Sequence, residues 1–305
     1  MNAIPETEKM LQLSSQPTVA LDCRNCLGES VVWDDRERRL FWVNIHDAEI
    51  WSWDPASDSE PVVLCLPERV GALGLRENRG LVLALASGFA LFDPKTAHLE
   101  KLTDVESDLP TTRLNDGRID PAGRFVCGGM DEGDPQRPLS AVYSFNRDHN
   151  PRKIIHDISC ANSICWSPNG QIMYFTDMPS RRIDAFDYDT ASGDLSNQRV
   201  FADLAKEPGS ADGSIVDAEG CLWNAQWRGS KLVRYCPDGT IDREVPLPVS
   251  NPTCLTFGGE NLDILFVTSA WFTLTDEERA QEPHAGSLFA FRPGVRGRCE
   301  FRYRD

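Results

Sequence analysis

Positive charge is scarce in this sequence of 305 residues. It has 31 Lys and Arg against 47 Asp and Glu, which gives a formal net charge of −16. Such a balance argues against nucleic acid or an anionic membrane surface as a partner. An acidic protein attracts cations, although acidity on a protein surface often serves solubility alone.

Long hydrophobic runs are also missing. No stretch approaches the roughly 18 apolar residues of a membrane span, and residues 1–16 lack the basic start and apolar core of a secretory signal. We therefore expect a cytoplasmic protein without membrane contact, present as a monomer or a weak homo-oligomer. Residues 1–16 are predicted to form a flexible N-terminal segment, and residues 17–305 a single domain.

The common catalytic motifs are absent from the sequence. It contains no G-x-S-x-G, no H-E-x-x-H, no P-loop and no G-x-G-x-x-G after a predicted strand. The five His residues fall outside the repeated positions described below, so we expect them to be solvent-facing or structural. Cys160 has no His at an equivalent inner position, which argues against a thiol nucleophile.

Ten cysteines are present, but their spacing indicates no zinc site. Cys23 and Cys26 form a lone C-x-x-C without a second pair. A chain of this length without a signal peptide favours reduced thiols. Four cysteines lie in apolar runs, where Cys behaves as a small buried hydrophobe: Cys127, Cys165, Cys221 and Cys254.

One pattern is repeated six times, at intervals of 41 to 50 residues. Each copy has an apolar anchor, a turn cluster, a β-rich run and a second aromatic strand, and a further short strand often follows. The anchors are Trp33, Leu75, Ile119, Trp166, Val216 and Phe257. Four short strands in a unit of this length are typical of a propeller blade. We predict an all-β fold, a six-bladed β-propeller with four-stranded blades.

Closure of such a ring needs a strand from the other end of the chain. The segment Thr18 to Cys23 precedes the first repeat and is predicted to supply the outer strand of the sixth blade. Two insertions interrupt the repeats, at Asp131 to Leu139 and at Ala270 to Ala285. The second contains Thr275-Asp276-Glu277-Glu278, a capping-box start for a short helix. Both insertions are candidates for loops over a central pocket.

One column of the repeat carries most of the candidate chemistry. Four residues before the anchors are Glu29, Gly71, Asn115, Asn162, Asp212 and Thr253. The first strand of each blade lines the channel of a propeller, so these positions are expected to converge there. Glu29, Asn162 and Asp212 supply oxygen ligands, and Asn115 can supply a fourth. An all-oxygen set favours Ca²⁺, Mg²⁺ or Mn²⁺ ahead of Zn²⁺.

Arg113 precedes Asn115 by two residues, so both side chains point to the same face of a strand. A cation facing a metal site is a candidate for binding hydroxyls or an oxyanion.

The sequence resembles the family of senescence marker protein (regucalcin), gluconolactonases and luciferin-regenerating enzyme. The resemblance rests on several segments together, from about Leu21 to Phe291. They are Leu27-Gly28-Glu29, Arg113-Leu114-Asn115-Asp116-Gly117, Asp120-Pro121-Ala122-Gly123-Arg124, Asn162 with Trp166-Ser167-Pro168-Asn169-Gly170, Arg182 to Asp189, Ala211-Asp212-Gly213 and Pro252-Thr253-Cys254.

The resemblance implies a six-bladed propeller with one divalent metal held by Glu29, Asn162 and Asp212. It also implies that Arg113 and Asn115 contact a sugar lactone and that Asp212 helps to activate water. The family's acidic substrate contact falls at Asp131 or Glu132, and we predict Glu132. Where the family usually has proline, this chain has Ala161 and Ala211, which is expected to loosen the turns that aim the ligands.

The expected function is metal-dependent hydrolysis of a sugar lactone, with the metal polarising the lactone carbonyl. Two alternatives stay open at this point. One is a related propeller hydrolase that acts on an aryl ester or organophosphate. The other is a non-catalytic propeller that binds calcium.

Overall fold

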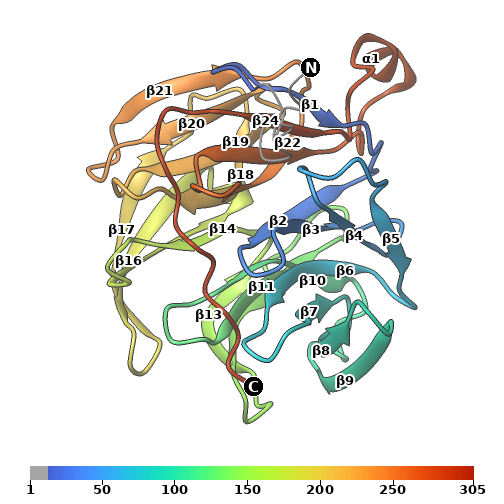
Figure 1. Cartoon of the computed structure of the whole chain (residues 1–305). Helices are drawn as coiled ribbons and strands as arrows, with labels where there is room; N and C mark the ends of the chain where they lie inside the picture. Colours follow the sequence, from blue (N-terminus) through green and yellow to red (C-terminus); the bar gives the residue numbers. More distant parts are fainter. Residues whose placement is uncertain (1–12) are drawn as a thin grey trace.

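The computed structural model describes residues 13–305, which form six four-stranded antiparallel sheets arranged around an axis (Figure 1). The predicted six-bladed propeller is confirmed. The first blade contains β2 (Gly28–Asp34), β3 (Arg39–Asn44), β4 (Glu49–Trp53) and β5 (Val62–Cys65), and the second contains β6 (Val70–Leu75), β7 (Leu81–Leu85), β8 (Gly88–Asp93) and β9 (His98–Asp104). The third blade contains β10 (Thr112–Ile119), β11 (Phe125–Asp131), β12 (Ser140–Phe145) and β13 (Arg152–Ile158), and the fourth contains β14 (Ala161–Trp166), β15 (Ile172–Asp177), β16 (Arg182–Asp189) and β17 (Asp194–Asp203). The fifth blade contains β18 (Ser210–Val216), β19 (Leu222–Trp227), β20 (Lys231–Tyr235) and β21 (Ile241–Pro246).

The sixth blade joins the two ends of the chain. It contains β22 (Pro252–Gly258), β23 (Ile264–Ser269), β24 (Leu288–Phe291) and, at its outer edge, β1 (Thr18–Leu21). Thr18 pairs with Ala290 across the antiparallel β1–β24 ladder. Closure by the N-terminal strand is therefore confirmed. Of the predicted N-terminal segment 1–16, residues 1–12 lie outside the described residues, whereas the Ser14 carbonyl accepts a hydrogen bond from the Arg292 backbone at 2.9 Å.

The hydrophobic core lies between neighbouring blades. In each blade the two middle strands are almost fully buried, as β3 shows with Leu40, Trp42 and Val43 at 0% exposure. One apolar cluster combines residues of the first two blades, among them Val43 and Leu83. Both faces of each blade are covered by the neighbouring blades. A middle strand such as β3 therefore has apolar residues on both faces rather than on alternate positions.

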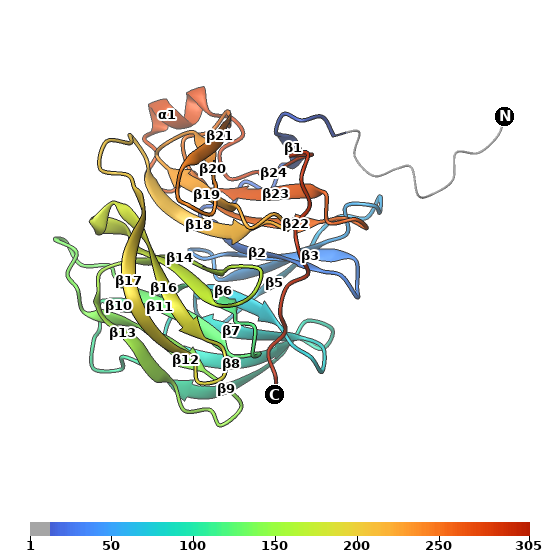
Figure 2. The same ribbon diagram turned by 90° about the vertical axis from the view of Figure 1, so that its left-hand side faces the viewer.

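The C-terminal segment closes one end of the channel. After β24 the chain runs across one face of the ring, while the helix α1 (Asp276–Gln281) lies on the other face (Figure 2). Glu300 forms an ion pair with Arg118 of β10 at 3.3 Å, and Tyr303 donates its backbone N–H to the Leu75 carbonyl at 2.8 Å. The segment thus ties the anchor ends of several inner strands together.

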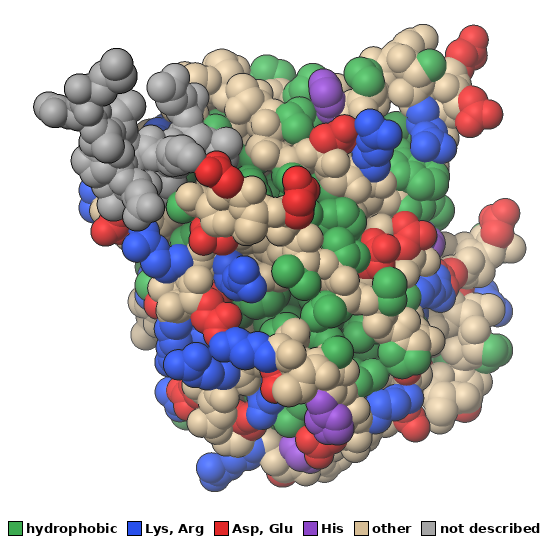
Figure 3. All heavy atoms as spheres, turned by 45° about the vertical axis from the view of Figure 1, so that its right-hand side comes forward, with side chains coloured by type: hydrophobic (Ala, Val, Ile, Leu, Met, Phe, Trp, Pro, Cys, Tyr) green, Lys and Arg blue, Asp and Glu red, His purple; other side chains and the backbone are tan. Residues whose placement is uncertain are grey.

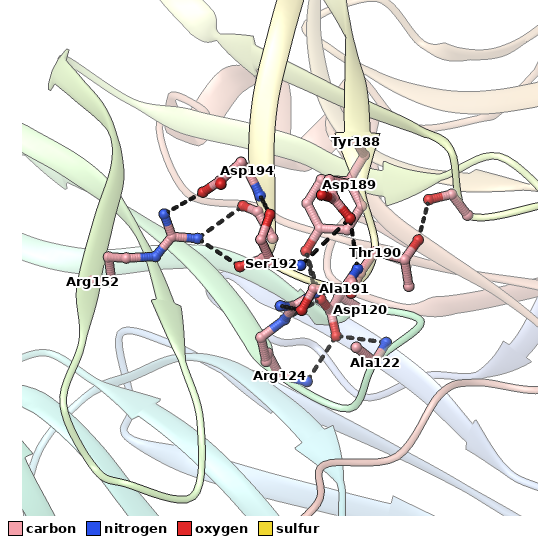
Figure 4. Close-up of polar contacts among 12 residues, drawn as sticks. Asp120, Ala122, Arg124, Arg152, Tyr188, Asp189, Thr190, Ala191, Ser192 and Asp194 are labelled. Atoms are coloured by element: carbon pink, nitrogen blue, oxygen red, sulfur yellow. Dashed lines mark hydrogen bonds and ion pairs between the residues drawn. The ribbon is translucent and has the colours of Figure 1, made fainter.

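A polar network joins the third blade to the fourth (Figure 4). Asp120, which is fully buried, accepts hydrogen bonds from Arg124 Nε at 2.6 Å and from the Tyr188 hydroxyl at 2.5 Å. Arg124 also donates to the Thr190 carbonyl at 2.6 Å. Asp120, Arg124 and Tyr188 belong to two of the segments that carry the family resemblance, and their hydrogen bonds join two blades.

Within residues 13–305, no helix is long and apolar enough to cross a membrane. Charged side chains of both signs surround hydrophobic ones on the face drawn in Figure 3.

The predicted capping box at the start of α1 is confirmed. The Thr275 side chain accepts a hydrogen bond from the Glu278 backbone, and the Glu278 carboxylate accepts one from the Thr275 backbone.

Candidate active site

A β-bulge lies at the column position of every inner strand. The pairing register shifts between Glu29 and Val32 in β2, between Asn162 and Cys165 in β14, and between Ala211 and Ser214 in β18. The strands β6, β10 and β22 shift at corresponding places. A bulge turns a side chain out of the alternation of its strand. The bulges therefore change the direction of the equivalent side chains in all six repeats, at the same level of the ring.

Three members of the column face one cavity. Glu29, Asn162 and Asp212 all line a space of about 200 Å³ at the start of the inner strands. Asn162 and Asp212 are each 3% exposed. The predicted ligands therefore come together from the first, fourth and fifth blades, as the repeat spacing indicates.

The other three members of the column contact the next blade, and of these Asn115 also lines the cavity. Asn115 Nδ2 donates to the Ala161 carbonyl at 2.9 Å, and Thr253 Oγ1 donates to the Gly28 carbonyl. A Cβ atom on Gly71 would lie 2.3 Å from the Leu114 carbonyl oxygen. Each contact is made to the residue that precedes the column position of the following blade. Gly71 and Thr253 thus hold the inner strands close together.

The two insertions contribute to the cavity wall, as predicted. Gln136 comes from the first insertion, and Phe272 and Thr273 come from the second. The remaining lining residues are Leu27, Arg113, Asn115, Met130, Cys160, Met178 and Trp227. Gln136, the two Met and the two aromatic residues were not found from the sequence, because they lie outside the repeated column.

The second insertion is held in place by a side chain of the fifth blade. Arg228 donates to the Glu278 carboxylate of α1 at 2.9 Å and also to the Thr273 carbonyl. Asn251 Nδ2 donates to the Phe272 carbonyl at 3.1 Å. The wall made by Phe272 and Thr273 is therefore fixed from both sides.

Burial and neighbouring carboxylates destabilise the ionised form of both carboxyl groups in the site. Burial, together with the charge of Asp116, raises the pKa of Glu29 to about 8. Burial and then the charge of Glu29 raise the pKa of Asp212 well above its ordinary range. Asp116 lies on the same inner surface, and burial raises its pKa as well. Three buried carboxyl groups with raised pKa values favour binding of a proton or a metal ion.

The donor set fits a hard divalent cation. In the part of the chain that the structure describes, the hydrogen bonds to the Glu29 and Asp212 carboxylates come from the adjacent backbone N–H groups of Ser30 and Gly213. Asn162 Oδ1 accepts a hydrogen bond from Asn115 Nδ2, at 3.3 Å. No group of three or more His, Cys, Asp or Glu suited to a metal occurs among residues 13–305. The set of two carboxylates and one amide oxygen is consistent with Ca²⁺, Mg²⁺ or Mn²⁺.

Arg113 and Asn115 lie together at the edge of the site. Arg113 Nη1 donates to Asn115 Oδ1 at 2.7 Å, and both residues line the cavity. Asn115 Oδ1 accepts from Arg113 and its Nδ2 donates to the Ala161 carbonyl, so the residue also supports its neighbours. Its role as a possible fourth ligand stays a prediction.

The two acidic residues of the first insertion have different surroundings. Asp131 is fully buried and accepts hydrogen bonds from Thr111 at 2.5 Å and from the Arg137 backbone at 2.9 Å, so it organises the loop. Glu132 accepts from Arg113 Nε at 2.9 Å but does not line the cavity itself. Partial burial opposes ionisation of Glu132, yet hydrogen bonds from Arg69 and the charge of Arg113 prevail and lower its pKa.

Ala161 and Ala211 lie in paired strands rather than in turns. Ala161 is in register with Asp177, and Ala211 with Gln226. Both are buried, at 0% and 2% exposure. The strand ladder restrains the backbone at both positions.

Cys160 lines the cavity but is poorly suited to nucleophilic chemistry. Burial, followed by the charge of Asp212, raises its pKa to about 12. The lone C-x-x-C is equally unreactive, since burial raises the pKa of Cys23 to about 12 and that of Cys26 to about 11. A thiolate, the reactive form, is therefore scarce at neutral pH at all three positions.

A further cavity of about 270 Å³ lies away from the channel, between the loops of the first two blades. Its charged lining residues pair with one another or with the C-terminal segment, for example Lys95 with Glu37 and Arg76 with Asp305. It has no convergent set of free oxygen donors, so the cavity at the column is the candidate site.

Comparison with known proteins identifies the family of this chain. The family profile described as SMP-30/Gluconolactonase/LRE-like region matches residues 27–271, which include all the column residues. The chain belongs to this family. Its match covers all six inner strands, from Glu29 to Thr253.

Members and relatives of this SMP-30/gluconolactonase family are similar over nearly the whole chain. L-arabinolactonase of Azospirillum brasilense is 40% identical, over 95% of this chain and 96% of its own length. A 6-deoxy-6-sulfogluconolactonase of Pseudomonas putida is 34% identical, over 90% and 94%. The solved structure of a calcium-binding protein, regucalcin, from Agrobacterium tumefaciens has a TM-score of 0.89 and 32% identity, and the match covers 94% of this chain and 97% of that one.

Proposed function

We propose that this protein hydrolyses a sugar lactone to the free sugar acid with the help of one divalent cation. The observation that carries the proposal is the convergence of Glu29, Asn162 and Asp212 on one cavity beside Arg113. Relatives named as lactonases share the family and extend over the same length. The similarity to a calcium-binding protein supports a divalent ion, with Ca²⁺ among the candidates.

Glu29, Asn162 and Asp212 would hold the cation, which when bound polarises the carbonyl group of the lactone. Asp212 is placed beside that position and accepts a proton from the attacking water. The water oxygen bonds to the carbonyl carbon, the ring C–O bond breaks, and a proton goes to the released ring oxygen. The products are one carboxylate, one hydroxyl group and one proton.

Arg113 orients the substrate. Its Nε and Nη1 atoms are taken by Glu132, Leu114 and Asn115, so its remaining nitrogen is the donor available to a lactone oxygen. An apolar wall covers the carbon skeleton and limits access of bulk water. It is formed by Met130, Met178, Trp227 and Phe272. A cavity of about 200 Å³ suits a single small sugar lactone.

The test is a pH-indicator assay of the purified protein on a panel of aldonolactones, with aryl esters and an organophosphate for comparison. Each substrate is measured after chelation and again with Ca²⁺, Mg²⁺, Mn²⁺ or Zn²⁺ added back. We expect turnover of polyhydroxy lactones that chelation abolishes and a divalent ion restores. Faster turnover of apolar esters would favour the propeller esterase, and stoichiometric metal binding without any turnover would favour a binding protein.

A further inference from the structure

Arg69 makes a two-pronged contact with Glu132. Its Nη1 and Nη2 atoms each donate to one carboxylate oxygen, both at 2.7 Å. Arg69 directly precedes β6, and Glu132 directly follows β11, so the pair joins the second blade to the third above the ring. The planar guanidinium fixes the plane of the carboxylate as well as its position.

Glu132 passes this constraint on to Arg113. Its Oε1 atom accepts from Arg113 Nε at 2.9 Å as well as from Arg69. On its other edge Arg113 Nη1 donates to the Leu114 carbonyl at 3.0 Å and to Asn115 Oδ1 at 2.7 Å. Among the described residues, none accepts a hydrogen bond from Arg113 Nη2. That atom is the one left for a ligand in the cavity that Arg113 lines.

We propose that Arg69 is a positioning residue, which acts through Glu132 to hold Arg113 so that Arg113 Nη2 faces a lactone oxygen. The inference rests on the proposed function, since it names how that site binds its substrate. It also gives Glu132 a different role from the one predicted, because Glu132 supports Arg113 from behind and does not touch the substrate. Arg69 had no signal in the sequence, as it lies outside the repeated column.

The charges of the three residues favour this order of action. Glu132 lies between two guanidinium groups, so it offsets the repulsion of Arg69 and Arg113. Loss of Arg69 leaves a Glu132–Arg113 pair whose charges balance, but the orientation of the Arg113 side chain is then less restrained. Loss of the Glu132 charge leaves two cations facing each other and should displace Arg113 further. Arg69 and Glu132 are 34% and 30% exposed, and ion pairs so accessible contribute little to folding.

The experiment compares Arg69→Met, Arg69→Lys, Glu132→Gln and the Arg69→Met/Glu132→Gln double variant with the wild type. Arg199→Met is the matched control, because Arg199 is 40% exposed and pairs with Asp187 in an outer strand. On an aldonolactone that the wild type hydrolyses, we expect Arg69→Met to raise KM about tenfold with little change in kcat, as for the loss of one well-aimed charged hydrogen bond. Arg69→Lys should recover part of the lost affinity for the substrate. Arg199→Met should have the same KM as the wild type.

The double variant tests the chain of contacts. If Arg69 acts through Glu132, the double variant should be no more impaired than Glu132→Gln alone, because it also removes the repulsion between Arg69 and Arg113, whereas multiplied effects would show that Arg69 acts independently and would overturn the proposal. An unchanged KM in Arg69→Met would overturn it as well. Should the wild type hydrolyse no lactone, the proposed function fails, and crystal structures decide the positioning role separately. An Arg113 side chain with the same orientation in Arg69→Met as in the wild type would then refute it.

Discussion

Asn115 Nδ2 lies 3.3 Å from Asn162 Oδ1, although the two residues are 47 positions apart in the chain. They occupy the same position of two successive repeats and differ in what they do. Asn162 lines the cavity as a predicted ligand, whereas Asn115, which lines it too, accepts a hydrogen bond from Arg113 and donates one to the backbone of the next blade. The same column therefore supplies both the candidate ligands and contacts that hold neighbouring blades together.

Removal of either carboxylate should abolish metal retention and activity. We expect Glu29→Gln and Asp212→Asn each to lower lactone turnover at least about 100-fold, since each removes a charged ligand and Asp212 also accepts the proton. Metal content after dialysis should fall in both. Asp194→Asn, which changes an exposed carboxylate paired with Arg152, should retain both properties. Undiminished turnover by metal-free Asp212→Asn would exclude the proposed chemistry.

The metal-free protein should lose stability as the pH rises. The pKa of Glu29 is about 8 in the fold, against 4.5 for an ordinary Glu. Between these values the folded state keeps a proton that the unfolded chain has released, so the free energy of unfolding decreases as pH increases. Denaturant unfolding in chelator, at about pH 5 and about pH 8, should show a smaller decrease for Glu29→Gln than for the wild type. Equal decreases would argue against a raised pKa.

Added metal should act in the opposite sense. Because the ligands must be deprotonated, a divalent ion competes with the bound proton and stabilises the fold more at pH 8 than at pH 5. Thermal unfolding with increasing Ca²⁺ or Mn²⁺ measures this effect. The difference between the two pH values should be smaller in Glu29→Gln, in which Asp212 still competes for the proton.

Gly71→Ala should be destabilising although the substitution is small. The new Cβ would lie 2.3 Å from the Leu114 carbonyl and would separate the inner strands β6 and β10. We expect a loss of about 2 kcal/mol in the free energy of unfolding, in the range for overpacking. Gly133→Ala is the control, because its Cβ would be 3.0 Å from a side-chain oxygen of Asp131 in a loop. A neutral Gly71→Ala would show that the blades can separate at no cost.

The link between the third and fourth blades should be strongly stabilising where it is buried. Arg124→Met removes the cation beside Asp120, which is 0% exposed, and we expect a loss of about 3 kcal/mol. Arg152→Met removes the neighbouring contact to Asp194, which is exposed, and should cost less than about 1 kcal/mol (Figure 4). Urea unfolding of the two variants gives the comparison. Similar losses would contradict the difference that burial predicts.

The repeated pattern made the fold and the ligands accessible from the sequence. Six apolar anchors at regular intervals require six equivalent units, and four short strands a unit define a blade. Once the units are equivalent, Glu29, Asn162 and Asp212 must converge, because a closed ring brings each inner strand to the same axis. The closing strand could be predicted for a related reason, since an open sixth blade would leave its edge unpaired.

Residues outside the repeat could not be placed in this way. Arg69, Gln136 and Phe272 lie in loops, where no period relates their sequence position to the channel. The C-terminal segment likewise had no counterpart in the repeats, yet Glu300 reaches Arg118 at the far end of the channel. Only the path of the chain in space decides which loop covers a given side of the ring.

The sequence alone determined the architecture and the oxygen-rich column, because both follow from a periodic arrangement of residue types. The tertiary structure decided the role of each column member, since that depends on how closely the next blade approaches. It assigned Asn115 to the support of Arg113 and showed that Gly71 allows close contact between blades. It also placed Arg69 and Glu132 behind Arg113, where hydrogen-bond geometry, rather than the order of residues, orients the Arg113 side chain.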